Sequence, residues 1–78
     1  RRPDLILLDY EMPIVNGAQV MQMIRGDNDF KDIPIVFLTG KNDLNTVQNI
    51  VSLKPEGYIL KDTKPKELHE TIDRYLLD

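Results

Sequence analysis

Residues 5–13 read LILLDYEMP, in which four apolar side chains are followed by Asp9 and then by a polar segment with a proline. A short unbroken apolar run of this kind is typical of a parallel strand that is covered on both faces. Ligands of open α/β sheets bind outside the carboxyl ends of the strands, so a carboxylate at this point is placed for chemistry. The stretch therefore predicts a strand at 5–8, a break in regular structure at Met12-Pro13, and a site residue at Asp9.

Two further apolar runs also end in a reactive side chain. Residues 35–38 (IVFL) lead to Thr39, and residues 58–60 (YIL) lead to Lys61. A carboxylate can act as a nucleophile or a metal ligand, a hydroxyl can donate to a phosphoryl oxygen, and an ammonium can offset developing charge. Any one of the three could be a polar residue where a strand meets solvent. Their recurrence at three successive strand ends favours a site that handles a phosphoryl group.

Helical patterns separate the three runs. A helix is expected over about 17–25, with Asn16 as its N-cap, and a second helix begins after Asn42 or Asp43. The last helix begins between residues 63 and 66. The apolar positions expected on the three helices' inner sides are Val20, Met21 and Ile24, then Leu44, Val47, Ile50 and Val51, then Leu68, Ile72, Tyr75 and Leu76. Strands that alternate with helices predict an α/β fold with a parallel sheet and right-handed crossovers.

Length and composition bound the remaining possibilities. The 78 residues make one domain at most, and 41% hydrophobic with 29% charged residues is typical of a globular, soluble chain. The absence of cysteine excludes disulfides and thiolate metal sites and is compatible with the cytoplasm, where we expect the protein to act. No apolar stretch approaches the roughly 20 residues of a membrane helix.

The charge pattern speaks against direct binding of nucleic acid. The net charge is −3, whereas such binding is carried by basic residues that neutralise phosphates. Lys61, Lys64 and Lys66 form a local basic cluster, but Glu67 and Glu70 follow it closely. We read this cluster as a solvated helix start. The single His69 stands mid-helix without a second His or Cys, which indicates a surface side chain and not a metal ligand.

Taken together, these motifs resemble the receiver domain of bacterial two-component response regulators. The resemblance covers 4–13 (DLILLDYEMP), Asn16-Gly17, 37–40 (FLTG), 57–61 (GYILK) and Glu67-Leu68, with matching separations between the site residues. It implies a flavodoxin-like, doubly wound parallel sheet. Residues 1–78 would supply a (βα)3 portion of that fold as a partial receiver domain.

The resemblance also implies a role for each site residue. Asp9 would be the phosphoacceptor, which takes a phosphoryl group from a sensor histidine kinase or a phosphotransfer protein. Thr39 would supply a hydroxyl to that group, and Lys61 an ammonium. Tyr58 would be the switch aromatic whose rotamer follows Thr39, although it also suits a half-buried sheet position. Asp9 and the backbone carbonyl of Glu11 would bind Mg²⁺, a cation that prefers oxygen ligands.

Two features depart from the family pattern. The acidic pair that follows the family's first strand has no counterpart, so we expect the chain to lack the first two strands and the first two helices. Mg²⁺ binding and phosphotransfer are then expected to be impaired, and the β-edge bared at 5–8 should favour a homodimer. Asp62 replaces the proline that usually follows the lysine, which predicts a trans peptide between Lys61 and Asp62.

Three functions stay open at this point. The first is a phosphoacceptor signalling module that switches an output domain or a partner and is not an enzyme beyond its own phosphorylation and dephosphorylation. The second is a pseudo-receiver used for dimerisation or docking. The third is a phosphatase of the haloacid-dehalogenase type, whose Asp-x-acid pattern Asp9 and Glu11 superficially match. The chain has neither a later acidic metal motif in context nor room for a cap domain, which disfavours the third function.

Overall fold

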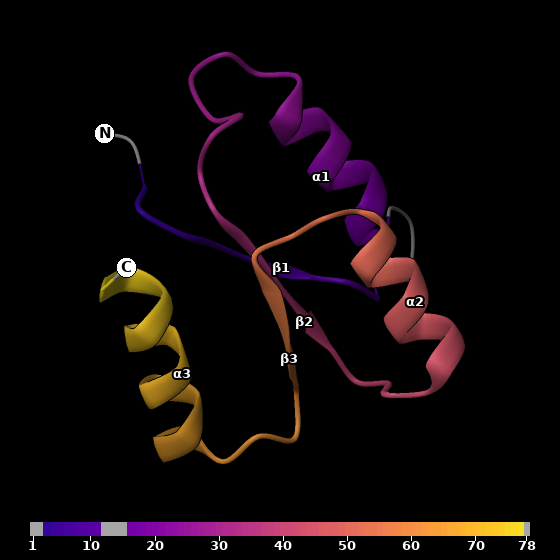
Figure 1. The fold of residues 1–78 in the computed structure, drawn as a ribbon, viewed down its shortest axis with the longest axis vertical. Helices are drawn as coiled ribbons and strands as arrows, with labels where there is room; N and C mark the ends of the chain where they lie inside the picture. The colour runs from indigo at the N-terminus through magenta and orange to yellow at the C-terminus, as the bar shows by residue number, and fades with distance from the viewer. Residues whose placement is uncertain (1–2, 12–15, 78) are drawn as a thin grey trace.

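The computed structural model describes residues 3–11 and 16–77, and the break predicted at Met12-Pro13 lies outside them. Within this part, strands and helices alternate along the chain (Figure 1). The elements are β1 (Ile6–Asp9), α1 (Gly17–Arg25), β2 (Ile35–Thr39), α2 (Leu44–Ser52), β3 (Gly57–Leu60) and α3 (Pro65–Leu77). The predicted α/β class is confirmed. None of these described helices has the length and apolar character needed to span a membrane.

The three strands form one parallel sheet in the order β1-β2-β3. β1 begins and ends one residue later than predicted, so that Asp9 is its last residue. In the register, Asp9 lies opposite Leu38, and Thr39 lies opposite Leu60. The Lys61 amide continues the ladder by donating to the Thr39 carbonyl at 2.9 Å. The carboxyl ends of all three strands therefore meet at one edge of the sheet.

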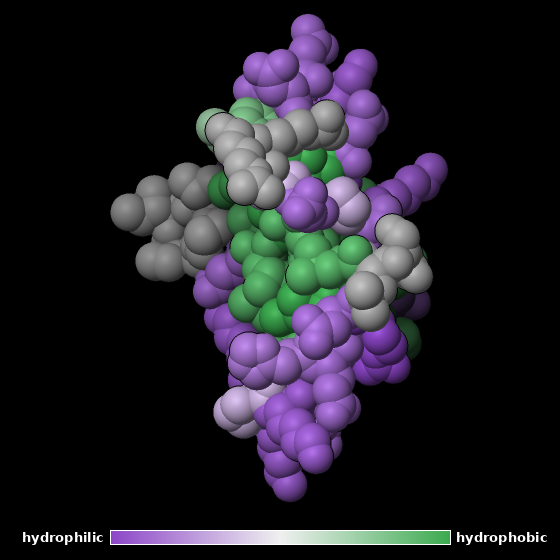
Figure 2. Space-filling model, turned by 90° about the vertical axis from the view of Figure 1, so that its left-hand side faces the viewer, coloured by the Kyte–Doolittle hydropathy of each residue, from purple (hydrophilic) through white to green (hydrophobic). Residues whose placement is uncertain are grey.

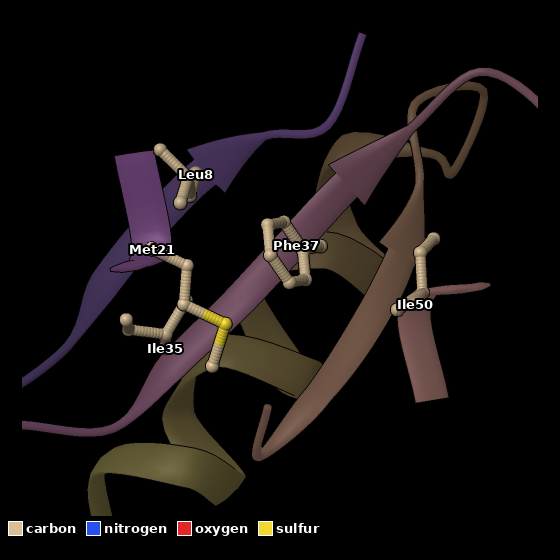
Figure 3. Packing of buried hydrophobic residues seen from close by; sticks show 5 residues of the cluster. All are labelled: Leu8, Met21, Ile35, Phe37 and Ile50. Carbon is tan, nitrogen blue, oxygen red and sulfur yellow. The ribbon is translucent and has the colours of Figure 1, made fainter. Parts of the chain in front are cut away.

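The main hydrophobic core lies between the sheet and the two helices α1 and α2, which cover the same face (Figure 1). Figure 3 shows its central members, Leu8, Met21, Ile35, Phe37 and Ile50. Phe37 is completely buried at the middle of β2, and the Tyr10 ring meets it edge to face at a centroid distance of 5.5 Å. This packing fixes the end of β1 against β2, and with it the position of Asp9.

Side chains and one close glycine contact define where the helices begin. The Asn16 side chain accepts from the Gln19 amide at 2.9 Å while the Gln19 side chain accepts from the Asn16 amide at 3.1 Å, so the predicted N-cap Asn16 forms a capping box with Gln19. Asp43, and not Asn42, caps α2 by accepting from the Thr46 amide. Gly17 starts α1 against the end of β1, with its amide donating to the Tyr10 carbonyl at 3.0 Å.

The opposite face of the sheet carries α3 (Figure 1). Tyr75 of α3 packs directly over Gly57, where a Cβ atom would meet the Tyr75 hydroxyl. Leu7 lies on this face too, because it alternates with the core residue Leu8. It is exposed, which corrects the prediction that helices cover both faces of β1. Figure 2 shows a broad apolar surface on the side of the molecule where α3 and the start of β1 lie.

Three apolar residues predicted on inner helix faces are in fact exposed. Leu44 and Val51 are 71% and 59% exposed, and Leu76 of α3 is 48% exposed. α2 turns Thr46 and Ile50 toward the sheet. Leu44 and Val51, seven residues or about two turns apart, share another side of the helix. Leu76 follows Tyr75 by about 100° around α3 and so lies beside the contact with the sheet.

Candidate functional site

Asp9 and Lys61 form an ion pair at the carboxyl edge of the sheet. The Lys61 Nζ lies 2.8 Å from Asp9 Oδ1 and donates to Oδ2 at 3.0 Å. The Glu11 backbone amide also donates to Asp9 Oδ1, at 3.1 Å. The pair bridges the two outer strands across β2, as their shared edge predicted. Both side chains are about two-fifths exposed, so an incoming group can reach them from solvent.

The carboxylate keeps the neighbouring ammonium charged. The hydrogen bond from Lys61 to Asp9, together with Coulomb attraction from Asp9 and Glu11, raises the pKa of Lys61 above its usual 10.5. Desolvation lowers this pKa but is a weaker influence than the hydrogen bond to Asp9. Lys61 is therefore a permanent positive charge beside the Asp9 carboxylate at neutral pH.

Thr39 is the buried member of the site. Its side chain is fully enclosed at the end of β2, and its Oγ1 lies 2.9 and 3.1 Å from the two carboxylate oxygens of Glu11. The Lys41 amide donates to the same Oγ1 at 3.1 Å. The hydroxyl has one proton to donate. The nearest acceptor for this proton is the Glu11 carboxylate, at 2.9 Å, and the Lys41 carbonyl lies further away, at 3.1 Å.

Glu11 was predicted to contribute through its backbone carbonyl, but the structure also gives its side chain a defined place. Glu11 Oε1 accepts from the Gly40 amide at 2.7 Å in addition to the Thr39 hydroxyl. Glu11 is half-buried. No pattern in the sequence indicated this contact, because it joins two loops from different strand ends.

Tyr58 lies in β3, paired with Phe37 of β2. Its side chain is exposed and stands on the face that α2 covers, because side chains alternate along a strand. Lys61, three residues further along, reaches across to Asp9.

The peptide that follows Lys61 is trans, as the replacement of proline by Asp62 predicted.

The described residues do not fit a complete Mg²⁺ site. No group of three or more His, Cys, Asp or Glu side chains is arranged around a common point within residues 3–11 and 16–77. Asp9, the one carboxylate proposed as a ligand, is already paired through both oxygens with Lys61. Mg²⁺ requires near-octahedral oxygen coordination, and one carboxylate and one carbonyl leave most of that to water or to other residues.

Comparison with known proteins identifies the family. The model of the response regulator receiver domain matches residues 1–73. The DNA-binding response regulator MtrA of Mycobacterium tuberculosis is 45% identical over 69 residues, which are 86% of this chain and 28% of MtrA. Thus the chain spans under a third of that relative's length.

Solved structures agree with this match. The receiver domain of sensor histidine kinase PA1611 from Pseudomonas aeruginosa, solved with a magnesium ion in its active-site cleft, superposes with a TM-score of 0.85 at 26% identity. That alignment covers 100% of this chain and 64% of the other. The Mn²⁺-bound response regulator Rcp1 gives a TM-score of 0.69 at 32% identity, over 95% of this chain and 53% of Rcp1. The chain thus belongs to the receiver-domain family of two-component response regulators.

Proposed function

We propose that this chain, as a partial receiver domain over residues 1–78, contributes the phosphoacceptor of a two-component signalling protein, with Asp9 as the acceptor. The observation that carries the proposal is the ion pair between Asp9 and Lys61 at 2.8 Å, with the Thr39 hydroxyl at the same edge of the sheet. An exposed carboxylate with a fixed ammonium beside it combines a nucleophile with a counter-charge for the transferred group.

The chemistry follows from these positions. An oxygen of the Asp9 carboxylate attacks the phosphorus of a phosphohistidine on a sensor kinase or a phosphotransfer protein. A P–O bond forms as the P–N bond breaks, and the released imidazole nitrogen takes up a proton. Lys61 then pairs with the oxygens of the new acyl phosphate, and Thr39 donates its hydroxyl to one of them. Tyr58, exposed on β3, would report the change to an output domain or a partner.

Residues 1–78 would supply only some of the ligands of a Mg²⁺ ion in this proposal. Related receiver domains hold Mg²⁺ or Mn²⁺ in their structures. Asp9 and the Glu11 carbonyl would supply two ligands, and the cation would neutralise charge on the phosphoryl oxygens. Because the described residues bring no three His, Cys, Asp or Glu side chains together around a common point, we expect residues 1–78 alone to bind Mg²⁺ weakly.

Assembly forms a second part of the proposal. β1 is an edge strand of the sheet formed by the described residues, and Leu7 is exposed on the face beside α3. Unpaired apolar edges and bared sheet faces favour association. We propose that residues 1–78 form a homodimer through β1 or through this face. Light scattering after size-exclusion chromatography would contradict it by showing a folded monomer at micromolar concentration.

The decisive experiment is phosphorylation of the full gene product with acetyl phosphate and Mg²⁺, followed by intact-mass analysis. We expect one phosphoryl group on the wild type and none on Asp9→Asn, which removes the nucleophilic carboxylate while keeping the side-chain size. Lys61→Met should retain Asp9 but accept phosphate more slowly. If Asp9→Asn is modified to the same extent as the wild type, Asp9 is not the acceptor.

The same preparation separates the two alternative functions. A phosphatase of the haloacid-dehalogenase type would turn over an aryl phosphate many times, whereas a receiver stops after one modification. A pseudo-receiver used for docking would remain unmodified with every donor, while its association with partners would be unchanged in Asp9→Asn.

A further inference from the structure

The side chain of Glu11 binds hydrogen-bond donors at the reacting edge of the site. Its Oε1 lies 2.9 Å from the Thr39 hydroxyl oxygen and 2.7 Å from the Gly40 amide nitrogen. Oε2 lies 3.1 Å from the same hydroxyl. A Cβ atom on Gly40 would lie 3.6 Å from Glu11 Oε1 and 3.9 Å from Lys61 Cδ. The carboxylate and the stem of the lysine that pairs with Asp9 thus both lie close to the same point beside Gly40.

A carboxylate and a phosphoryl group make the same demand on such donors. Both present negatively charged oxygens that accept short, charge-assisted hydrogen bonds. The Thr39 hydroxyl and the Gly40 amide each have a single proton to donate. While both protons point at Glu11, they are not available to an oxygen on Asp9. One anion must therefore leave these donors before another can use them.

We propose that the Glu11 carboxylate is an internal anion that occupies the Thr39 and Gly40 donors and competes with the phosphoryl group for them. The inference rests on the proposed function, since it assumes that the group added to Asp9 reaches the end of β2. The site then has two states. In one state, the Glu11 carboxylate accepts the hydrogen bonds of both donors. In the other, Glu11 has swung away and the acyl phosphate holds Thr39 and Gly40.

Lys61 links the two states. Its ammonium pairs with Asp9 and is also attracted by Glu11, which contributes to its raised pKa. A phosphoryl group on Asp9 would attract the ammonium more strongly than either carboxylate, and its charge would repel Glu11. Phosphorylation of Asp9, which requires the Thr39 and Gly40 donors, therefore also helps to displace the Glu11 carboxylate from them.

The test measures the affinity of the full gene product for beryllium trifluoride, a phosphoryl analogue, in the presence of Mg²⁺. Glu11→Ala removes the competitor and is expected to tighten binding by about three- to tenfold, equivalent to about 0.7–1.4 kcal/mol. Glu11→Gln keeps an acceptor oxygen and should give a smaller gain. Asp62→Asn removes one negative charge from the loop after Lys61 and is the control for general electrostatics.

If Glu11 occupies the donors, the affinity for beryllium trifluoride should be highest in Glu11→Ala, lower in Glu11→Gln and lowest in the wild type. Asp62→Asn should bind the analogue about as tightly as the wild type. Glu11→Ala binding no tighter than Asp62→Asn would overturn the inference. Equal gains in Glu11→Ala and Glu11→Gln would overturn it as well, because charge removal alone would then explain the effect.

A second measurement separates this inference from the proposed function. The Gly40 amide resonance is expected to move upfield in Glu11→Ala, and its hydrogen exchange to accelerate, in protein that has seen no phosphoryl analogue. If beryllium trifluoride binds neither the wild type nor Glu11→Ala, the proposed function fails whatever the amide shows. If the Gly40 amide is unchanged by Glu11→Ala, the contact is absent and the inference fails even where the analogue binds.

Discussion

Replacing Gly17 by Ala tests how tightly the start of α1 is docked on the strand end that carries Asp9. An added Cβ would lie 2.8 Å from the Asp9 carbonyl oxygen, 2.9 Å from Phe37 Cε1 and 2.9 Å from Tyr10 Cα. Optimal contacts of this kind lie at about 3.5–4.0 Å, so all three are overlaps of more than about half an ångström. Two of the three atoms are backbone, and the third belongs to a fully buried ring, so none can yield easily.

The expected change in the free energy of unfolding of Gly17→Ala follows from two opposing contributions. Overpacking of this kind costs about 1–3 kcal/mol, and the better helix propensity of Ala returns less than about 1 kcal/mol. We expect a net loss of about 1–2 kcal/mol in the free energy of unfolding. With an m-value of about 1 kcal/mol/M for a small domain, the urea midpoint should fall by about 1–2 M, measured by circular dichroism.

Gly26→Ala is the matched control on the same helix. Gly26 has φ −81°, which any residue adopts, and an added Cβ would make ordinary contacts of 3.5 and 3.6 Å with the Gln22 and Met23 carbonyls. Its midpoint should stay unchanged or rise, because Ala restricts the unfolded chain. The reasoning is refuted if Gly17→Ala unfolds at the same urea concentration as Gly26→Ala.

Two further outcomes are expected from other contacts. Gly57→Ala should destabilise the chain by about 1–2 kcal/mol, because the new methyl group displaces Tyr75. In a Tyr75→Leu background this loss should disappear. A double-mutant cycle, measured by urea unfolding, in which the two substitutions have additive effects would contradict the contact. Hydrogen bonds from the Thr46 hydroxyl and amide lower the pKa of Asp43 below its usual 3.8. The resulting stabilisation should be fully present above pH 3.8 and be lost as the pH falls through the lower folded pKa. Asp43→Asn should flatten the dependence of the urea midpoint on pH over about pH 2–5, and an unchanged slope would count against the cap.

The sequence predicted the elements of the fold because its local signals agreed with one another. Apolar runs, the cap residues Asn16 and Asp43, and the helical spacing after each cap all point to the same alternation of strands and helices. Parallel pairing then brings the strand ends to one edge. The approach of Lys61 to Asp9 followed from that topology, and the structure confirms it at 2.8 Å.

Tertiary features were less predictable. Leu7, Leu44 and Val51 are apolar and suitably spaced, but burial also depends on where the neighbouring elements end, which no single stretch encodes. The contact between Glu11 and Thr39 depends on the paths of two loops. Hydrogen bonds of this kind leave no periodic pattern in the sequence.

The central position of β2 also has a consequence for how the chain acquires its structure. Its register pairs Ile6 with Ile35 and Phe37 with Tyr58, so each strand pair closes only after a whole helix has been spanned. Long closures of this kind slow folding, and the parallel sheet of the described residues contains no hairpin that could serve as a local nucleus. During synthesis β1 has no strand to pair with until β2 has been made. β2 in turn gains its second neighbour only when β3 has been made. Pulse-labelled hydrogen exchange during refolding should therefore protect the amides of β2 together with those of its neighbours, and early protection of β1 alone would contradict this order of events.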